Sequence, residues 1–216
     1  MREPVSGLTH LAGAVLSAAG LVALVRAAVR GTGGGGTWPL VAFLVFGVSL
    51  VLLYTASSLY HLLPLSTSGT LVLRRIDHMM IYVLIAGTYT PFCLISLRGR
   101  GAWGWGLFGA VWGLAVAGII LKAVWMRAPR WLSTGFYLGM GWLVVVAIGP
   151  LLRSVPAGGL EWLAVGGLLY TVGAVFYATK WPRLVPGVFG FHEVWHLFVL
   201  AGSFSHFWAV YRFLRF

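Results

Sequence analysis

The sequence has few charged residues, and acidic residues are the scarcest. Only 9% of its 216 residues are charged, whereas about a quarter are charged in a typical soluble domain. So few charges cannot cover a globule of this size, which excludes a cytosolic enzyme, a secreted scaffold and a disordered chain. The single cysteine, Cys93, cannot form an internal disulfide and indicates no redox compartment. The four acidic residues are Glu3, Asp77, Glu161 and Glu193.

Apolar residues make up 60% of the chain, and the mean hydropathy of +0.93 is typical of a membrane-embedded protein. They form continuous runs rather than the alternating pattern of a membrane β-barrel. Each run has about the 20 residues that a helix needs to cross a bilayer. We therefore predict an all-α polytopic membrane protein, a seven-transmembrane-helix bundle that forms one domain over residues 1–216. The predicted spans are 5–25, 38–60, 76–97, 102–121, 131–152, 159–179 and 188–210.

Glycine, proline and charged residues mark the loops between these spans. The expected loops are 31–36, 64–69, 98–101, 127–130, 154–159 and 180–186. Pro91 and Pro150 lie within spans and are expected to kink or end their helices. Glycines spaced four residues apart are typical of close helix packing in lipid. The pairs that show this spacing are Gly109/Gly113 and Gly135/Gly139.

The formal charge of +11 does not indicate a nucleic-acid partner. The basic residues stand singly or in pairs between apolar runs, where positive side chains meet lipid headgroups. They do not fix the membrane orientation, because eight lie on the side of the N-terminus and seven on the other. The first group is Arg2, Arg74, Arg75, Lys122, Arg127, Arg130, Lys180 and Arg183.

Five polar residues at membrane depth form the candidate site, because such residues are costly in lipid and often functional. Ser57 and His61 are four residues apart near the end of the second span. Asp77 lies near the start of the third span, and His192 and His196 are four apart near the start of the seventh. In an antiparallel succession of helices, these positions all fall on one side of the membrane.

The three histidines predict a zinc site. Two histidines at i and i+4 direct their imidazoles toward one point, and His61 supplies a third ligand from another helix. Three protein ligands with water in the fourth position are typical of catalytic zinc, and no cysteine ligand argues for a softer metal. Asp77 is then placed to orient or deprotonate the water, and Ser57 to hydrogen-bond the water or a ligand.

Several motifs resemble those of the hemolysin III family, which belongs with the progestin and adipoQ receptors and includes the adiponectin receptors among its relatives. They are SSLYH at 57–61, RIDH at 75–78, AGTYTPF at 86–92, and HEVWH at 192–196 followed by Gly202 and His206-Phe207. The resemblance implies a seven-helix bundle in the plasma (inner) membrane. It implies zinc held by His61, His192 and His196, with Asp77 and Ser57 beside the metal.

The resemblance also implies a membrane lipid as substrate or ligand. Adiponectin receptors are linked to ceramide hydrolysis, and bacterial members to haemolysis and membrane-lipid homeostasis. We therefore expect a zinc-dependent, ceramidase-like hydrolase of a lipid amide or ester. The alternatives are a non-catalytic receptor or membrane-homeostasis regulator, a pore-forming haemolysin, and an intramembrane zinc peptidase with Glu193 as general base.

Each candidate residue also has a purely structural interpretation. The three histidines can hydrogen-bond within the bundle without any metal. Ser57 can donate to the carbonyl of Leu53, as serine often does inside helices. Asp77 can pair with Arg74 or Arg75 instead of acting on water.

Other polar residues are assigned to the surroundings of the site. His206 is ten residues beyond His196, about 15 Å along a helix, so it cannot share the metal and is expected to bond another helix. His10 lies on the correct side to line a cavity. His78 is expected to support the site or face the lipid interface, and Tyr89 to contribute packing.

Overall fold

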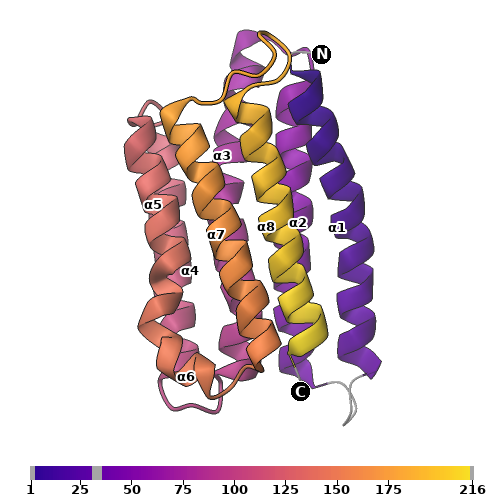
Figure 1. The fold of residues 1–216 in the computed structure, drawn as a ribbon, viewed down its shortest axis with the longest axis vertical. Coiled ribbons are helices and arrows are strands. Elements are labelled where there is room, and N and C mark those ends of the chain that lie inside the picture. The colour runs from indigo at the N-terminus through magenta and orange to yellow at the C-terminus, as the bar shows by residue number, and fades with distance from the viewer. Residues whose placement is uncertain (1–2, 31–35, 215–216) are drawn as a thin grey trace.

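The structure, a computed structural model, describes residues 3–30 and 36–214 and is a bundle of long helices (Figure 1). The loop predicted at 31–36 lies outside the described residues, apart from Gly36. Two of the long helices continue through a short π-helical (η1) or 3-10 (η2) turn. The elements are α1 (Pro4–Arg30), α2 (Thr37–Leu62), α3 (Thr67–Pro91), η1 (Phe92–Ser96), α4 (Trp103–Val124), α5 (Arg130–Trp142), η2 (Leu143–Ala147), α6 (Ile148–Leu152), α7 (Ala157–Thr179) and α8 (Phe191–Phe213).

The predicted all-α membrane fold is confirmed. Within the described residues, six helical segments are long and apolar enough to cross a membrane, and α5, η2 and α6 together make one of them. Helix α8 is the seventh segment of similar length, with 23 residues. Apart from an isolated bridge between Val185 and Phe189, the described part of the chain contains no β-structure. The polar residues of α8 include His192 and His196 of the candidate site and also Ser203, Ser205 and His206.

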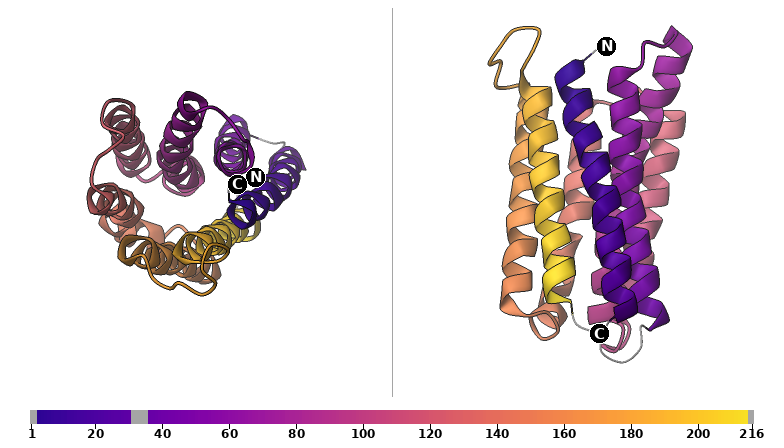
Figure 2. Two further views of the ribbon diagram at one scale, coloured as in Figure 1. Left: turned by 90° about the horizontal axis from the view of Figure 1, so that it is seen from above. Right: turned by 90° about the vertical axis from the view of Figure 1, so that its right-hand side faces the viewer.

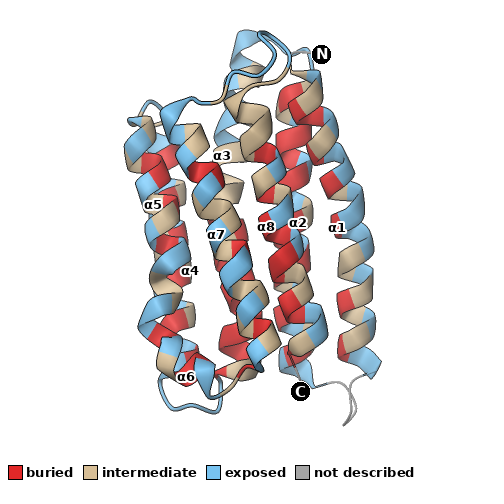
Figure 3. Ribbon diagram, viewed as in Figure 1, coloured by how far each residue is buried: buried red, intermediate tan, exposed pale blue. Residues whose placement is uncertain are grey.

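The helices form a ring in the order α1, α2, α3, α4, α5, α7 and α8, and contacts between α8 and α1 close it (Figure 2). Many large apolar side chains are exposed, among them Leu16, Val124 and Trp131. Exposed residues occur along the whole length of the helices (Figure 3). A water-soluble protein does not expose apolar patches of this extent. The outer surface of the ring is therefore suited to lipid.

Helix α3 begins earlier than the sequence predicted. The expected span started at residue 76 after a loop at 64–69, but the helix begins at Thr67. Ser66 caps it, because its hydroxyl accepts a hydrogen bond from the Gly69 N–H at 3.2 Å. The apolar pattern missed this start because a capped helix can extend beyond its apolar run. Asp77 consequently lies about three turns inside α3, not near its start.

The two prolines fall where helices change geometry. Helix α3 ends at Pro91 and passes into η1, as predicted. The second break, η2, lies just before Pro150. In a regular α-helix the proline ring would clash with the carbonyl four residues earlier, and proline has no N–H to bond it. Tyr89 also enters this break: its hydroxyl donates to the Gly141 carbonyl at 2.6 Å and accepts from the Val144 N–H at 2.8 Å. Tyr89 therefore bonds the backbone that the break leaves free, in addition to packing.

The expectation for the four spaced glycines is wrong. A Cβ atom added at Gly109, Gly113, Gly135 or Gly139 would have no atom within 4 Å outside its own helix neighbourhood. Spacing identifies a small-residue surface but not whether that surface faces a neighbouring helix. The close approaches lie elsewhere, at Gly47, Gly87, Gly118, Gly166 and Gly202.

We expect Gly87→Ala to destabilise the bundle. An added Cβ would lie 2.7 Å from the Ser49 Cβ, which is fixed to the backbone of α2. Overpacking of this kind lowers the free energy of unfolding by about 1–3 kcal/mol. Thermal melting of the purified protein in detergent measures the effect. Gly109→Ala is the matched control and should be neutral or stabilising by up to about 1 kcal/mol, so equal losses in both variants would contradict this packing.

Candidate metal centre

The structure brings the three predicted histidines together. His61 projects from α2, and His192 and His196 project from adjacent turns at the start of α8. One ring nitrogen of each lies within 4.8 Å of the others. His61 and His196 are buried, and His192 is partly buried. Although the two helices are far apart in sequence, they place three imidazoles around one point, which can hold a metal ion.

The ring geometry supports that fit. The His61 centroid lies 5.0 Å from that of His192 and 4.9 Å from that of His196. The two α8 rings are 4.7 Å apart. The Nε2 atom of His61 is buried without a hydrogen-bond partner in the described part of the chain. A buried, unpaired nitrogen is unfavourable, and a metal ion would satisfy it.

Glu3, which directly precedes α1, and Ser6 in the first turn of α1 contact the Nδ1 atoms of these rings. His61 Nδ1 lies 2.5 Å from Glu3 Oε2, and His196 Nδ1 lies 3.2 Å from the Ser6 carbonyl oxygen. His192 Nδ1 is 3.6 Å from the same Glu3 oxygen. Carboxylates and carbonyls only accept, so Nδ1 of His61 and of His196 donates and Nε2 keeps its lone pair. Histidines that bind metals in proteins are commonly oriented in this way.

Sequence reasoning assigned no role to Glu3 and Ser6. One signal was available, because Glu3, Ser6 and His10 follow an i, i+3, i+7 pattern that places them on one helix face. His10 lines the cavity, as predicted. Its ring stacks on that of His196 with a centroid separation of 3.7 Å and an interplanar angle of 13°. Helix α1 therefore contributes a face of the centre.

We expect Glu3→Ala to weaken metal binding without abolishing it. The substitution removes the acceptor for His61 Nδ1, and loss of such an outer partner typically lowers metal affinity by about 10–100-fold. Competition against a chelator of known affinity measures the change. Glu161→Ala, an exposed acid on α7, is the matched control and should bind as wild type. Equal affinity in Glu3→Ala and wild type would show that Glu3 does not orient the ligand.

Ser57 and Asp77 line the same cavity as His192 and His196. The Ser57 hydroxyl is buried and does not form the alternative bond to the Leu53 carbonyl. It lies within reach of the Asp77 carboxylate. Asp77 is 13% exposed, and its nearest basic partner is His78 Nδ1 at 3.7 Å. In the part of the chain described, no ion pair joins Asp77 to the neighbouring arginines. The two side chains therefore form a polar pair on the wall of the cavity.

Glu193 and His206 take part in other contacts. The two carboxylate oxygens of Glu193 accept from the Ser6 hydroxyl at 2.7 Å and the Gly190 N–H at 2.8 Å. Glu193 thus caps the start of α8 and ties it to α1. His206 Nε2 lies 3.1 Å from the Leu163 carbonyl oxygen, which is the predicted bond to another helix.

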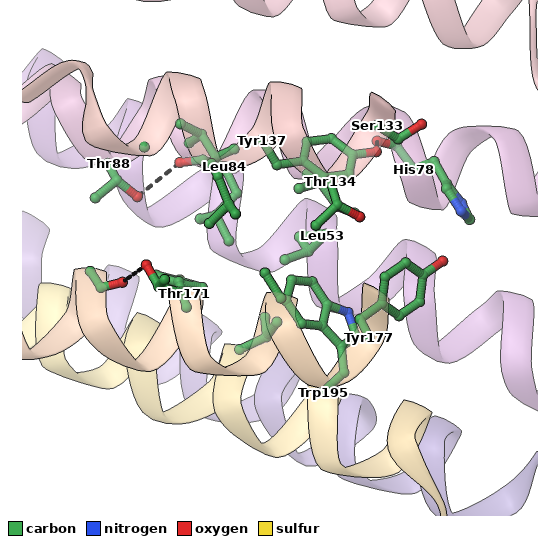
Figure 4. A pocket seen from close by; sticks show the side chains of 18 of the residues that line it. Leu53, His78, Leu84, Thr88, Ser133, Thr134, Tyr137, Thr171, Tyr177 and Trp195 are labelled. Atoms are coloured by element: carbon green, nitrogen blue, oxygen red, sulfur yellow. Dashed lines mark hydrogen bonds between the residues drawn. The ribbon is translucent and has the colours of Figure 1, made fainter. Parts of the chain in front are cut away.

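A cavity of about 700 Å³ extends through the ring from the histidine cluster. Tyr137 on α5 faces Trp195 on α8 across it, and Thr88 and Thr171 lie toward its other end (Figure 4). Its walls are mainly apolar, and its volume falls in the range of sites for small molecules. The chain therefore combines a potential metal centre with a space that suits an apolar ligand.

Comparisons with known proteins show the family. Residues 1–207 match the family described as haemolysin-III related. The chain is 41% identical over 208 residues to the hemolysin-3 homolog of Bacillus subtilis (strain 168), covering 96% of this chain and 92% of the relative. It is 43% identical over 209 residues to hemolysin-3 of Bacillus cereus, covering 96% and 90%.

A human protein, monocyte to macrophage differentiation factor, is 28% identical over 184 residues, covering 82% of this chain and 72% of the relative. The bacterial relatives and the apolar helices indicate a protein of the plasma membrane. Together with the match over residues 1–207, they lead to one conclusion: the chain is an integral membrane protein that belongs to the haemolysin-III related family.

Proposed function

We propose that the chain is a zinc-dependent hydrolase of a membrane lipid amide or ester. The observation that carries this proposal is the convergence of His61, His192 and His196 beside an apolar cavity lined by Asp77. A metal centre, a carboxylate and a lipid-sized space are the parts that such a reaction needs.

Zinc is the metal that we propose for this donor set. Three neutral imidazoles suit zinc, and the described residues offer no thiolate at this centre. The buried Nε2 of His61, which has no hydrogen-bond partner, provides a lone pair directed to the centre. Zinc bound there supplies a Lewis acid and an acidic water at neutral pH.

The protein residues have separate roles in this proposal. Glu3 and the Ser6 carbonyl fix the tautomers of His61 and His196. Asp77 accepts a proton from the attacking water and returns it to the leaving group, as a general base and acid. The Ser57 hydroxyl, which lines the same cavity as Asp77, donates to the water or to the substrate carbonyl.

The apolar cavity supports a lipid substrate, whose chain would lie among the walls with its polar bond near the histidines. A ceramide-like amide is the first substrate to test, by analogy with the adiponectin receptors, and another acyl lipid is the second. Fold-level analogy alone does not identify a substrate. The assay therefore compares lipid amides with lipid esters of equal chain length.

The direct test is metal analysis combined with lipid turnover. Wild-type protein purified without chelators should contain about one zinc per chain and release fatty acid from one of these lipids. Chelation should stop the release, and added zinc should restore it. A protein that contains zinc but hydrolyses neither class of lipid would contradict the hydrolase.

One observation favours a second candidate, a zinc-containing regulator without turnover. His61 is not among the residues that line the cavity, although His192 and His196 are. A centre that joins α1, α2 and α8 can stabilise or sense their arrangement without reaching a substrate. This candidate predicts full zinc content and no hydrolysis. A pore-forming haemolysin predicts conductance of the pure protein in a planar bilayer, which neither zinc proposal does.

A further inference from the structure

Five basic side chains line the cavity at its end on the N-terminal side of the bundle. They come from three successive parts of the chain: α3, the end of α4 with the loop after it, and the start of α5. Asp77 is the only acid among the described residues that line the cavity. We call this group the basic mouth: Arg74, Arg75, Lys122, Arg127 and Arg130.

In the part of the chain that the structure describes, no side chain of the basic mouth forms an ion pair with a carboxylate. Lys122 is only 3% exposed, and its Nζ donates to the Ser133 hydroxyl at 2.5 Å. Arg130 donates to the Tyr177 carbonyl at 3.3 Å, and its guanidinium lies 4.7 Å from the centroid of the Tyr177 ring. Within residues 3–30 and 36–214, neither cation forms an ion pair with Asp or Glu. A buried ammonium without an anion is costly, so a ligand anion would stabilise it.

These cations differ from ordinary interfacial anchors elsewhere on the protein. Lys180 and Arg183 belong to the same membrane side but do not line the cavity. At the opposite end, the Arg98 guanidinium lies 5.0 Å from the centroid of the Trp38 ring, and Arg100 bonds the Ser154 hydroxyl. Attraction to the general headgroup layer accounts for such residues. It does not account for a nearly buried lysine that faces an internal cavity.

We propose that the cavity binds an acyl lipid whose phosphate headgroup keeps a net negative charge. The headgroup would lie at the basic mouth, where guanidinium groups and an ammonium can bind phosphate oxygens. The acyl chain would lie among apolar residues deeper in the cavity, such as Leu84, Val144 and Leu163. This inference rests on the proposed function for its lipid site and adds the charge of the ligand that the site prefers.

Binding of matched lipids tests the proposal. The full chain in neutral detergent is titrated with phosphatidylglycerol or phosphatidylcholine of identical chains, and binding is followed by native mass spectrometry. Wild type should prefer phosphatidylglycerol, because each cation near a headgroup contributes about fivefold in affinity. Lys122→Gln and Arg130→Gln should each lower phosphatidylglycerol affinity by about fivefold and lower phosphatidylcholine affinity less, so that the preference for phosphatidylglycerol falls.

Arg98→Gln is the matched control, since it removes an arginine that also lies near an aromatic ring but outside the cavity. It should bind both lipids as wild type does. If Lys122→Gln does not fold, as judged by melting, the exposed Arg75 provides the equivalent variant Arg75→Gln. Equal affinity for the two lipids, or an equal effect of Arg98→Gln, would overturn the proposal.

Two further measurements separate the sources of the anion and the two proposals. Inorganic phosphate at the concentration of the lipid should not displace phosphatidylglycerol, and complete displacement would reject a lipid in favour of a free anion. The titration is repeated after chelation of metal. Selective binding should persist in the metal-free protein. Selective binding by untreated, zinc-containing protein that hydrolyses no lipid would reject the hydrolase and leave this inference standing.

Discussion

His196→Ala is expected to lose most of its bound zinc and to melt at a lower temperature than wild type. The substitution removes one of three imidazoles and leaves His61 and His192 as an incomplete site. A metal at about 100 times its dissociation constant stabilises the native state by about 2.7 kcal/mol. For a chain of this size, that loss corresponds to a fall in Tm of about 5–10 °C. Metal analysis and thermal melting measure the two effects on one sample.

His206→Ala is the matched control, because it also removes a buried imidazole from α8. Its ring bonds the Leu163 carbonyl and lies outside the cluster. This variant should retain zinc even if it melts earlier. In addition, chelation should lower the Tm of wild type but not that of His196→Ala. If His206→Ala loses as much zinc as His196→Ala, the loss reflects general destabilisation and the ligand assignment is wrong.

Asp77→Asn should retain its zinc but hydrolyse lipid about 10²–10⁴-fold more slowly. Asparagine has nearly the shape of aspartate and keeps an acceptor oxygen, but it cannot take a proton from the attacking water. Single-turnover hydrolysis by protein of known zinc content gives the rate, and metal analysis gives the occupancy. If Asp77→Asn loses zinc as completely as His196→Ala, then Asp77 is a ligand and its assignment as a base is wrong.

Glu193→Gln distinguishes this mechanism from an intramembrane peptidase. In the structure, Glu193 accepts from the Gly190 N–H and the Ser6 hydroxyl. Glutamine keeps an acceptor for one of these bonds, so zinc content and turnover should both change little. A peptidase that uses Glu193 as its base would instead lose activity with zinc retained.

The fold could be predicted from the sequence because each membrane helix is marked by its own continuous apolar run. Runs of about 20 apolar residues identify membrane helices, and antiparallel succession then fixes which helix ends share a side. That rule brought His61 on α2 together with His192 and His196 on α8 without any knowledge of packing. The start of α3 was missed because the Ser66 cap, not hydropathy, sets it.

Features that depend on the rotation of a helix could not be predicted in this way. The spacing of Gly109 and Gly113 is the same whether their surface faces lipid or another helix, and it faces no helix here. Glu3 and Ser6 contact residues 58 and 190 positions away along the chain. No local pattern reports a contact of that range. The basic mouth is likewise visible only once α3, α4 and α5 surround a common cavity.

The most direct test of the account is a crystal structure with anomalous scattering recorded on both sides of the zinc absorption edge. The protein should be purified without chelators at neutral pH. We predict one zinc peak surrounded by ring nitrogens of His61, His192 and His196, with Asp77 beside it but not bound. Absence of a zinc peak, or a peak that these three histidines do not surround, would contradict the account.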